Sequence, residues 1–173
     1  MTETSVFLIG PSGVGKSTLA WEAARASDSI EVIDLDQEVC RQFPTLYGDA
    51  GDRWPEFWTR TIEIIDDRKE RRSTPVLLFD LGAGCLQTDG PIMFLENQEH
   101  VVLVWGKAEV IYKRHQRGDG FWHSRPLEKF REAEYSDRRM RIYQLAKTSI
   151  DVGEKTIRAS VEEFQEVLLA IAS

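Results

Sequence analysis

Short apolar runs alternate along the chain with segments whose apolar residues recur at helical spacing. The runs are apolar at nearly every position, as expected of strands buried on both faces of a parallel sheet. They lie at residues 5–9, 30–33, 75–80, 101–105 and, more weakly, 148–152. In the clearest helical segment, one face is formed by Trp54, Phe57, Trp58, Ile62 and Ile65.

Helices are predicted over residues 16–26, 54–72, 108–116, 127–146 and 161–172. Alternating strands and helices imply right-handed crossovers, so we predict an α/β fold with a five-stranded parallel sheet between two layers of helices. In such a sheet, ligands bind beyond the carboxyl ends of the strands. The length of 173 residues suits one domain spanning 1–173, and the sequence contains no repeat or linker.

Composition excludes several classes of protein. Hydrophobic residues make up 42% of the chain and charged residues 29%, as in ordinary globular proteins. The net charge of −7 opposes nucleic-acid binding, which needs a basic face. We expect no membrane span and no signal peptide, because no apolar run is long enough and the N-terminus lacks the pattern. Cys40 and Cys85 form no zinc motif and fit a reducing, cytoplasmic setting.

The strongest motif is a phosphate-binding loop. Within "FLIGPSGVGKSTLA", Gly10 to Ser17 match G-x-x-x-x-G-K-[ST], between a predicted strand and a predicted helix. Backbone N–H groups and the helix dipole favour a polyphosphate such as that of ATP there. We expect Lys16 to reach the β- and γ-phosphates and the Ser17 hydroxyl to bind Mg²⁺. The full set of expected ATP phosphate-binding residues is Gly13, Val14, Gly15, Lys16, Ser17 and Thr18.

Three carboxylates near predicted strand ends are candidates for the chemistry. Asp34 and Asp36 end the second strand in "VIDLDQE", where one can accept the proton of an acceptor hydroxyl and the other can lie near the metal. Asp36 could instead only cap the following helix. Asp80 ends the third strand like a Walker B carboxylate, which would hold Mg²⁺ through water. Gly82 and Gly84 let the backbone approach a ligand closely, unless they form an ordinary turn.

Three arginines are candidates for binding anions. Arg60 could be held by Glu63, three residues further along the same helix. Arg125 lies in the stretch 114–126, which lacks a clear period and predicts a loop that acts as a lid. Arg139 lies in "SDRRMRIYQLA". Each arginine taken alone could equally be a solvated charge on a helix.

Together these segments resemble the shikimate kinase family nearly from end to end. "VIDLDQEV" is similar to that family's I-D-x-D-x-E-I segment, which implies a metal role for Asp34 and contact with the reacting hydroxyl for Asp36. "GAG" stands where the family has three glycines lining the acceptor site, which implies that role for Gly82, Ala83 and Gly84.

The resemblance also extends to the three arginines. "RTIE" and "RMRIYQLA" match segments whose arginines bind the acceptor's carboxylate, here Arg60 and Arg139. "RPL" matches the family's lid motif, whose arginine reaches the phosphates, here Arg125. The ordered set of motifs therefore implies an acceptor that is a small hydroxylated carboxylic acid.

The resemblance implies a P-loop kinase fold with a lid at about 114–126 and a place in aromatic amino acid biosynthesis. The expected reaction is ATP-dependent phosphorylation of a hydroxyl on a small carboxylic acid, with shikimate to shikimate 3-phosphate as the first candidate. The expected catalytic residues are Lys16, Asp36 and Arg125, and the expected metal residues are Ser17, Asp34 and, from the Walker B pattern, Asp80. We expect no nucleic-acid or membrane partner, and we favour a monomer.

Several departures from the family pattern keep other acceptors open, among them Asp80 two residues before "GAG" and the bulky Phe121 and Trp122 in the lid segment. Ala83 replaces the middle glycine and places a methyl group where the acceptor should lie close to backbone. A kinase for another polyol, a sugar acid or an antibiotic is therefore an alternative. A catalytically silent, nucleotide-binding regulator is the alternative from a different class, and the retained Lys16, Asp34 and Asp36 argue against it.

Overall fold

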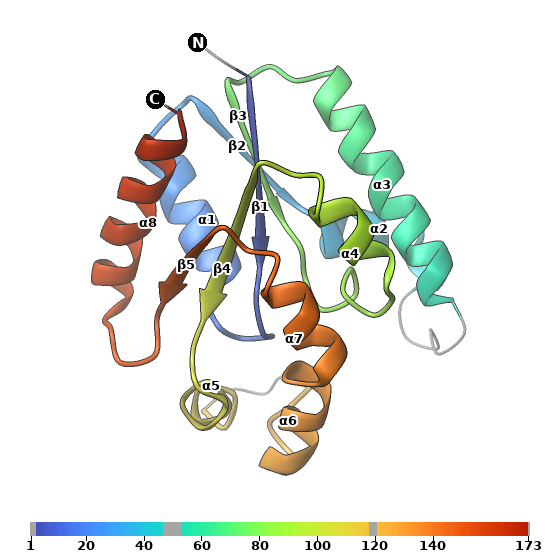
Figure 1. Ribbon diagram of the computed structural model, residues 1–173, viewed down its shortest axis with the longest axis vertical. Helices are drawn as coiled ribbons and strands as arrows, with labels where there is room; N and C mark the ends of the chain where they lie inside the picture. Colours follow the sequence, from blue (N-terminus) through green and yellow to red (C-terminus); the bar gives the residue numbers. More distant parts are fainter. Residues whose placement is uncertain (1–2, 47–52, 118–120, 173) are drawn as a thin grey trace.

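One five-stranded parallel sheet forms the centre of the molecule (Figure 1). The computed structural model describes residues 3–46, 53–117 and 121–172. The strands are β1 (Thr4–Ile9), β2 (Ile30–Asp34), β3 (Val76–Asp80), β4 (His100–Trp105) and β5 (Thr148–Asp151), in the order β2-β3-β1-β4-β5. All five strands predicted from apolar runs are thus confirmed.

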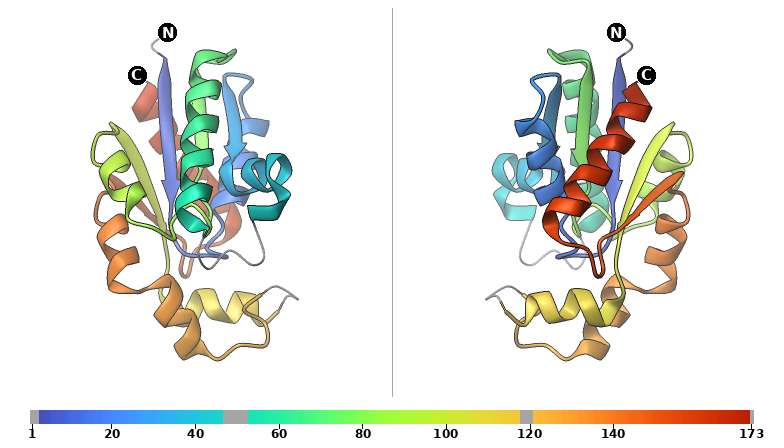
Figure 2. Two further views of the ribbon diagram at one scale, coloured as in Figure 1. Left: turned by 90° about the vertical axis from the view of Figure 1, so that its right-hand side faces the viewer. Right: turned by 90° about the vertical axis from the view of Figure 1, so that its left-hand side faces the viewer.

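Helices cover both faces of the sheet, which makes three layers (Figures 1 and 2). The helices are α1 (Lys16–Arg25), α2 (Leu35–Gln42), α3 (Trp54–Glu70), α4 (Gly90–Leu95), α5 (Ala108–His115), α6 (Leu127–Glu134), α7 (Asp137–Tyr143) and α8 (Ile157–Ala172), with a short 3₁₀ helix at Pro44–Leu46. Helices α1 and α8 pack on one face, and α3, α4 and α7 pack on the other.

The central strand shows why the strand segments are apolar at every position. In β1, Phe7 and Ile9 belong to the core under α3 and α4, whereas Val6 and Leu8 belong to the core under α1 and α8. Successive side chains of a strand point to opposite faces, so a strand covered on both sides needs apolar residues throughout. All four side chains are fully buried.

The structure corrects three helix predictions. The predicted helix over 127–146 is two helices, α6 and α7, because Ser136 starts a new one and its Oγ accepts a hydrogen bond from the Arg139 N–H (3.4 Å). Both short helices bury apolar residues, Phe130 in α6 and Ile142 and Tyr143 in α7. The helical spacing of apolar residues therefore continues across the break between them. Helix α3 ends at Glu70, two residues early, and α8 begins at Ile157 rather than residue 161.

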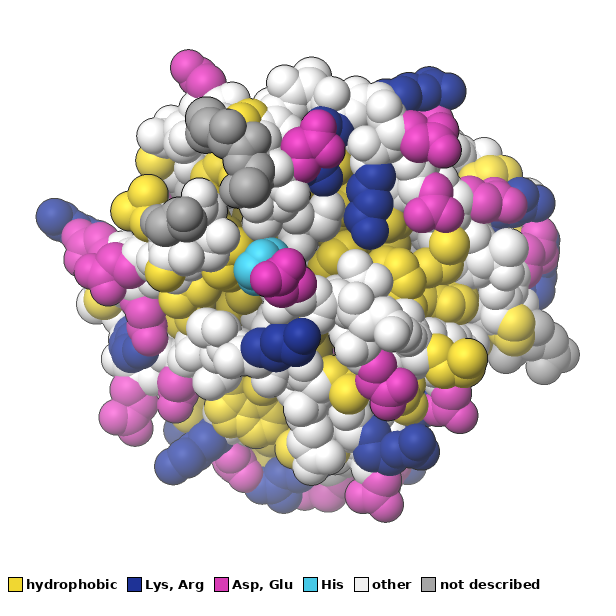
Figure 3. Space-filling model, turned by 45° about the horizontal axis from the view of Figure 1, so that its top comes forward, with side chains coloured by type: hydrophobic (Ala, Val, Ile, Leu, Met, Phe, Trp, Pro, Cys, Tyr) yellow, Lys and Arg dark blue, Asp and Glu magenta, His cyan; other side chains and the backbone are white. Residues whose placement is uncertain are grey.

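The fold gathers several chemistry-bearing residues at one end of the molecule. The register pairs Asp34 of β2 with Asp80 of β3 at the carboxyl ends of the strands, and the loop after β1 lies at the same end. Helices α5 and α6 lie beyond this end in Figure 1. Figure 3 brings the opposite end of the molecule forward, and there acidic and basic side chains are interspersed with hydrophobic ones.

Two observations concern the cysteines and the question of a membrane-spanning helix. Cys40 and Cys85 are both free thiols, and Cys85 is buried. In the part of the chain that the structure describes, no helix is long and apolar enough to span a membrane.

Candidate active site

The predicted phosphate loop joins β1 to α1. Gly10, Gly13 and Gly15 have φ angles of 147°, 72° and 107°, which side-chain-bearing residues rarely adopt. A Cβ on Gly10 would also collide with the carbonyl oxygen of Val104. Lys16 is 6% exposed, and its Nζ donates to the carbonyl oxygens of Gly10 (3.1 Å) and Pro11 (3.3 Å). The ammonium group is therefore folded over its own loop, where a phosphate chain would lie.

A cavity of about 410 Å³ borders the phosphate loop. The predicted residues Gly13, Val14, Gly15 and Thr18 line one side of it. Arg114 lines another side, and its guanidinium donates to the carbonyl oxygens of Val14 (3.2 Å) and Val152 (2.6 Å). The segment between β5 and α8, including Lys155 and Thr156, completes the wall. No sequence motif identifies Lys155 and Thr156 as site residues, because only the folding of the chain brings them close to the phosphate loop.

Ser17 and Asp80 form the part of the site best suited to Mg²⁺. Ser17 Oγ donates to Asp80 Oδ2 at 2.6 Å, and Asp80 is 2% exposed. Burial raises the pKa of Asp80 above its ordinary value. Its Oδ1 is buried without a hydrogen-bond partner. A hydroxyl beside a carboxylate with a spare oxygen, next to a phosphate loop, fits a Mg²⁺ ion that takes its remaining ligands from phosphate and water.

Asp34 is engaged differently from Asp80. Its Oδ1 accepts from the Gln37 N–H (3.0 Å) and its Oδ2 from Gln37 Nε2 (2.8 Å), so Asp34 is the N-cap of α2. Burial raises the pKa of Asp34 as well. Within residues 3–46, 53–117 and 121–172, no three Asp, Glu, His or Cys side chains are grouped so as to hold a metal by themselves.

Asp36 lies in the first turn of α2, so its predicted place at the end of the strand is wrong. Its Oδ2 accepts from the Gly84 N–H (2.8 Å) and its Oδ1 from the Cys85 N–H (3.1 Å). A Cβ on Gly82 would collide with the Asp36 carboxylate. The structure therefore brings the predicted acceptor residues Asp36, Gly82 and Gly84 together. The alternative that Asp36 only caps the helix is wrong, because the N-cap of α2 is Asp34.

Arg139 reaches the same turn from α7. It is 1% exposed, and its Nη2 donates to the carbonyl oxygen of Ala83 (3.0 Å). Its Nε and Nη1 are buried without hydrogen-bond partners. Among the described residues no carboxylate forms an ion pair with Arg139. A buried guanidinium with two free nitrogens is chemically prepared to bind an anion.

The other two predicted arginines contact different groups. Arg60 pairs with Glu63 (2.7 Å), as predicted, and its guanidinium lies 4.7 Å from the ring centroid of Phe43. The Arg125 guanidinium lies 3.5 Å above the centroid of the exposed Phe121 ring. These contacts place neither arginine against the turn at 82–84 or the phosphate loop.

The predicted lid is only partly a loop. Arg114 and His115 belong to α5, and Trp122 is 7% exposed and packs on Phe130. Residues 118–120 of the predicted lid lie outside the described residues. The lid prediction is therefore wrong at its first two residues and stays a prediction for the rest.

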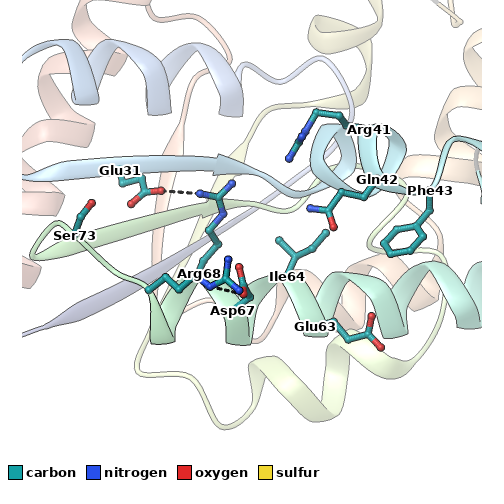
Figure 4. A pocket seen from close by; sticks show the side chains of 10 residues that line it. Glu31, Arg41, Gln42, Phe43, Glu63, Ile64, Asp67, Arg68 and Ser73 are labelled. Carbon is teal, nitrogen blue, oxygen red and sulfur yellow. Dashed lines mark hydrogen bonds and ion pairs between the residues drawn. The ribbon is translucent and has the colours of Figure 1, made fainter.

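A larger cavity of about 650 Å³ lies between α2 and α3, away from the phosphate loop (Figure 4). Its arginines pair with acidic side chains. Arg68 contacts Glu31 (3.2 Å), and Arg71 contacts Asp67 (2.9 Å). Because its cations are already neutralised and no predicted site residue lines it, we assign the chemistry to the smaller, phosphate-loop cavity and the turn at 82–84.

The sheet order, together with a phosphate loop whose serine bonds a buried strand-end carboxylate, is typical of P-loop kinases. A family model described as "Shikimate kinase" matches residues 12–169. The chain belongs to the shikimate kinase family.

Individual relatives agree with this assignment. A shikimate kinase of Staphylococcus epidermidis is 26% identical over 161 residues, which cover 86% of each protein. The crystal structure of shikimate kinase from Bacteroides thetaiotaomicron has a TM-score of 0.70 and 21% identity, covering 96% of this chain and 98% of that one. Shikimate kinase from Acinetobacter baumannii in complex with shikimate has a TM-score of 0.70 and 20% identity, covering 98% and 94%.

Proposed function

We propose that this protein transfers the γ-phosphoryl group of ATP to a hydroxyl of shikimate, giving shikimate 3-phosphate and ADP. The observation that carries the proposal is that the buried, unpaired guanidinium of Arg139 and the carboxylate of Asp36 contact the backbone of the same turn, at residues 83–85. A cation of that kind needs an anion, and a carboxylate next to it can orient a hydroxyl. An acid that carries hydroxyl groups supplies both.

On the donor side, the phosphate loop binds ATP through the N–H groups of residues 13–18, and Lys16 leaves its loop carbonyls to reach the β- and γ-phosphates. The nucleoside lies in the cavity beside Arg114. Ser17 and Asp80 would hold Mg²⁺, and Asp34 at the start of α2 is the third residue assigned to the metal. When bound, the metal neutralises charge on the transferred phosphoryl group.

On the acceptor side, Asp36 accepts the proton of the attacking hydroxyl, since each of its oxygens has a lone pair beyond the bond it already accepts. Arg139 binds the acceptor's carboxylate, and Arg60 joins it by leaving Glu63. Arg125 leaves Phe121 to stabilise the phosphates. Residues 1–173 act as one kinase domain, which the single sheet and the family match over 12–169 support.

A coupled assay for ADP across a panel of acceptors tests this proposal. The panel contains shikimate, other cyclic hydroxy acids, sugar acids, neutral polyols and a nucleoside, each with MgATP. We expect shikimate to give the highest kcat/KM, with Lys16→Ala as the inactive control. Preference for a polyol or nucleoside would refute the carboxylate assignment, and tight ATP binding without ADP formation on any acceptor would support the regulator instead.

A further inference from the structure

The backbone of Ser12, inside the phosphate loop, is held from both sides by the part of the molecule that lies beyond the sheet. Its N–H donates to Glu134 Oε2 at 3.0 Å, and its carbonyl oxygen lies 3.0 Å from His115 Nε2. A carbonyl oxygen only accepts, so Nε2 of His115 carries the proton. Gly13 allows this approach, because a Cβ there would overlap the His115 ring. Side chains from two helices therefore hold the two peptide groups on either side of the Ser12 Cα.

Glu134 is an unusual residue for such a contact. It is the last residue of α6 and is only 3% exposed. Within the described chain no Lys, Arg or His forms an ion pair with it. A buried carboxylate without a cation is rare, and its hydrogen bond to an N–H is stronger than a neutral one. The Glu134 side chain therefore holds the loop through its hydrogen bond to the Ser12 N–H.

The backbone of Glu134 is tied to the helix that carries Arg139. The hydroxyl of Tyr143 in α7 donates to the Glu134 carbonyl oxygen at 3.2 Å. Ser136, between the two residues, caps α7 through the N–H of Arg139. The stretch from Glu134 to Arg139 is therefore a fixed turn, with the phosphate loop held at one end and the acceptor-binding guanidinium at the other.

We propose that Glu134 is a positioning residue, which sets the distance between the phosphate loop and Arg139 and so between the γ-phosphate and the acceptor's hydroxyl. The proposal rests on the proposed function for its acceptor site. Phosphoryl transfer needs the reacting atoms about 3–3.5 Å apart, and a misplacement of about 1 Å costs on the order of 100-fold in rate. Nucleotide and acceptor each keep their own contacts when this link is lost, so their binding is spared.

Steady-state kinetics of three variants test the link. Glu134→Ala removes the acceptor of the Ser12 N–H, Glu134→Gln keeps an oxygen there, and Glu132→Ala on the exposed face of α6 is the matched control. For Glu134→Ala we expect kcat to fall at least about tenfold, with both KM values within about threefold of wild type. Glu134→Gln should retain about a third or more of the wild-type kcat, and the control should behave as wild type. A loss of kcat in Glu134→Ala that Glu134→Gln does not rescue, or no loss at all, overturns the proposal.

Hydrogen exchange at the Ser12 amide provides a readout that needs no acceptor. In the nucleotide-free protein, Glu134→Ala should speed exchange at this amide about tenfold or more, and Glu134→Gln should restore slow exchange. Unchanged exchange in Glu134→Ala would show that Glu134 does not hold the loop. If wild type phosphorylates no acid in the panel, the proposed function fails on its own, and the exchange result still decides whether the loop is held.

Discussion

Replacing Arg139 by alanine removes the cation that we assign to the acceptor's carboxylate. The guanidinium is 1% exposed and makes one hydrogen bond, to Ala83, so two of its three nitrogens are left for an anion. Because the site is shielded from water, the lost interaction is not replaced by solvent. Acceptor binding should therefore weaken strongly, while the nucleotide, held by the phosphate loop, should bind as before.

The size of the effect follows from burial. Removing one partner from a desolvated charge pair costs about 2–5 kcal/mol. At about 1.4 kcal/mol per factor of ten, this is a loss of affinity of about 30-fold to a few thousandfold. Arg139→Lys keeps the charge but loses the planar fork that matches a carboxylate, so its loss should be intermediate.

Titration calorimetry of shikimate into the ADP complex measures this loss directly. Arg141→Ala is the matched control, because Arg141 lies on the same helix with its side chain exposed. We expect Arg141→Ala to bind shikimate within about twofold of wild type, as exposed charges contribute little. The reasoning is refuted if Arg139→Ala binds shikimate as tightly as wild type, or if it loses ADP affinity to the same extent.

Three further predictions concern the phosphate loop and the carboxylates. Lys16→Ala should keep its melting temperature but less than a tenth of wild-type turnover in the coupled ADP assay, because Lys16 offsets charge on the transferred group; higher turnover would contradict the role. Asp36→Asn should lower kcat on the order of 10²–10⁴-fold with nearly unchanged ATP affinity by calorimetry, and a normal rate would exclude Asp36 as the proton acceptor. Burial raises the pKa of Asp80 in the folded protein, so the native state binds the carboxyl proton more tightly than the unfolded chain does. The free energy of unfolding therefore falls as the pH rises through the pKa of Asp80 in the folded state. Asp80→Asn should therefore melt higher than wild type at about pH 7 without ligand, with a gap that narrows towards about pH 4; a gap that widens in acid would contradict this.

The sequence allowed the sheet and the phosphate loop to be predicted because both depend on local chemistry. Five continuous apolar runs can be buried only between two layers of helices, and the motif at Gly10 to Ser17 needs a strand before it and a helix after it. The i,i+3 pair of Arg60 and Glu63 was predictable for the same reason and is confirmed.

The errors arose where several local choices have similar energies. Asp34 and Asp36 are both good N-cap residues, and only tertiary contacts with Gly84 and Cys85 place Asp36 inside the helix. The hydrogen bonds of Glu134 and His115 to the Ser12 backbone could not be predicted from the spacing of residues in the sequence. These residues lie 122 and 103 positions from Ser12, and packing of α5 and α6 alone brings them together.

The most direct test of the central claim compares shikimate with its neutral carboxamide as acceptors of wild-type protein, measured as kcat/KM for ADP release with MgATP. The two molecules share every hydroxyl and differ only in the group that we assign to Arg139. We predict that the acid is preferred at least about 30-fold, as expected for a buried charge pair. Equal phosphorylation of acid and carboxamide would contradict the assignment of the Arg139 site to a carboxylate, and phosphorylation of neither would contradict shikimate as the acceptor.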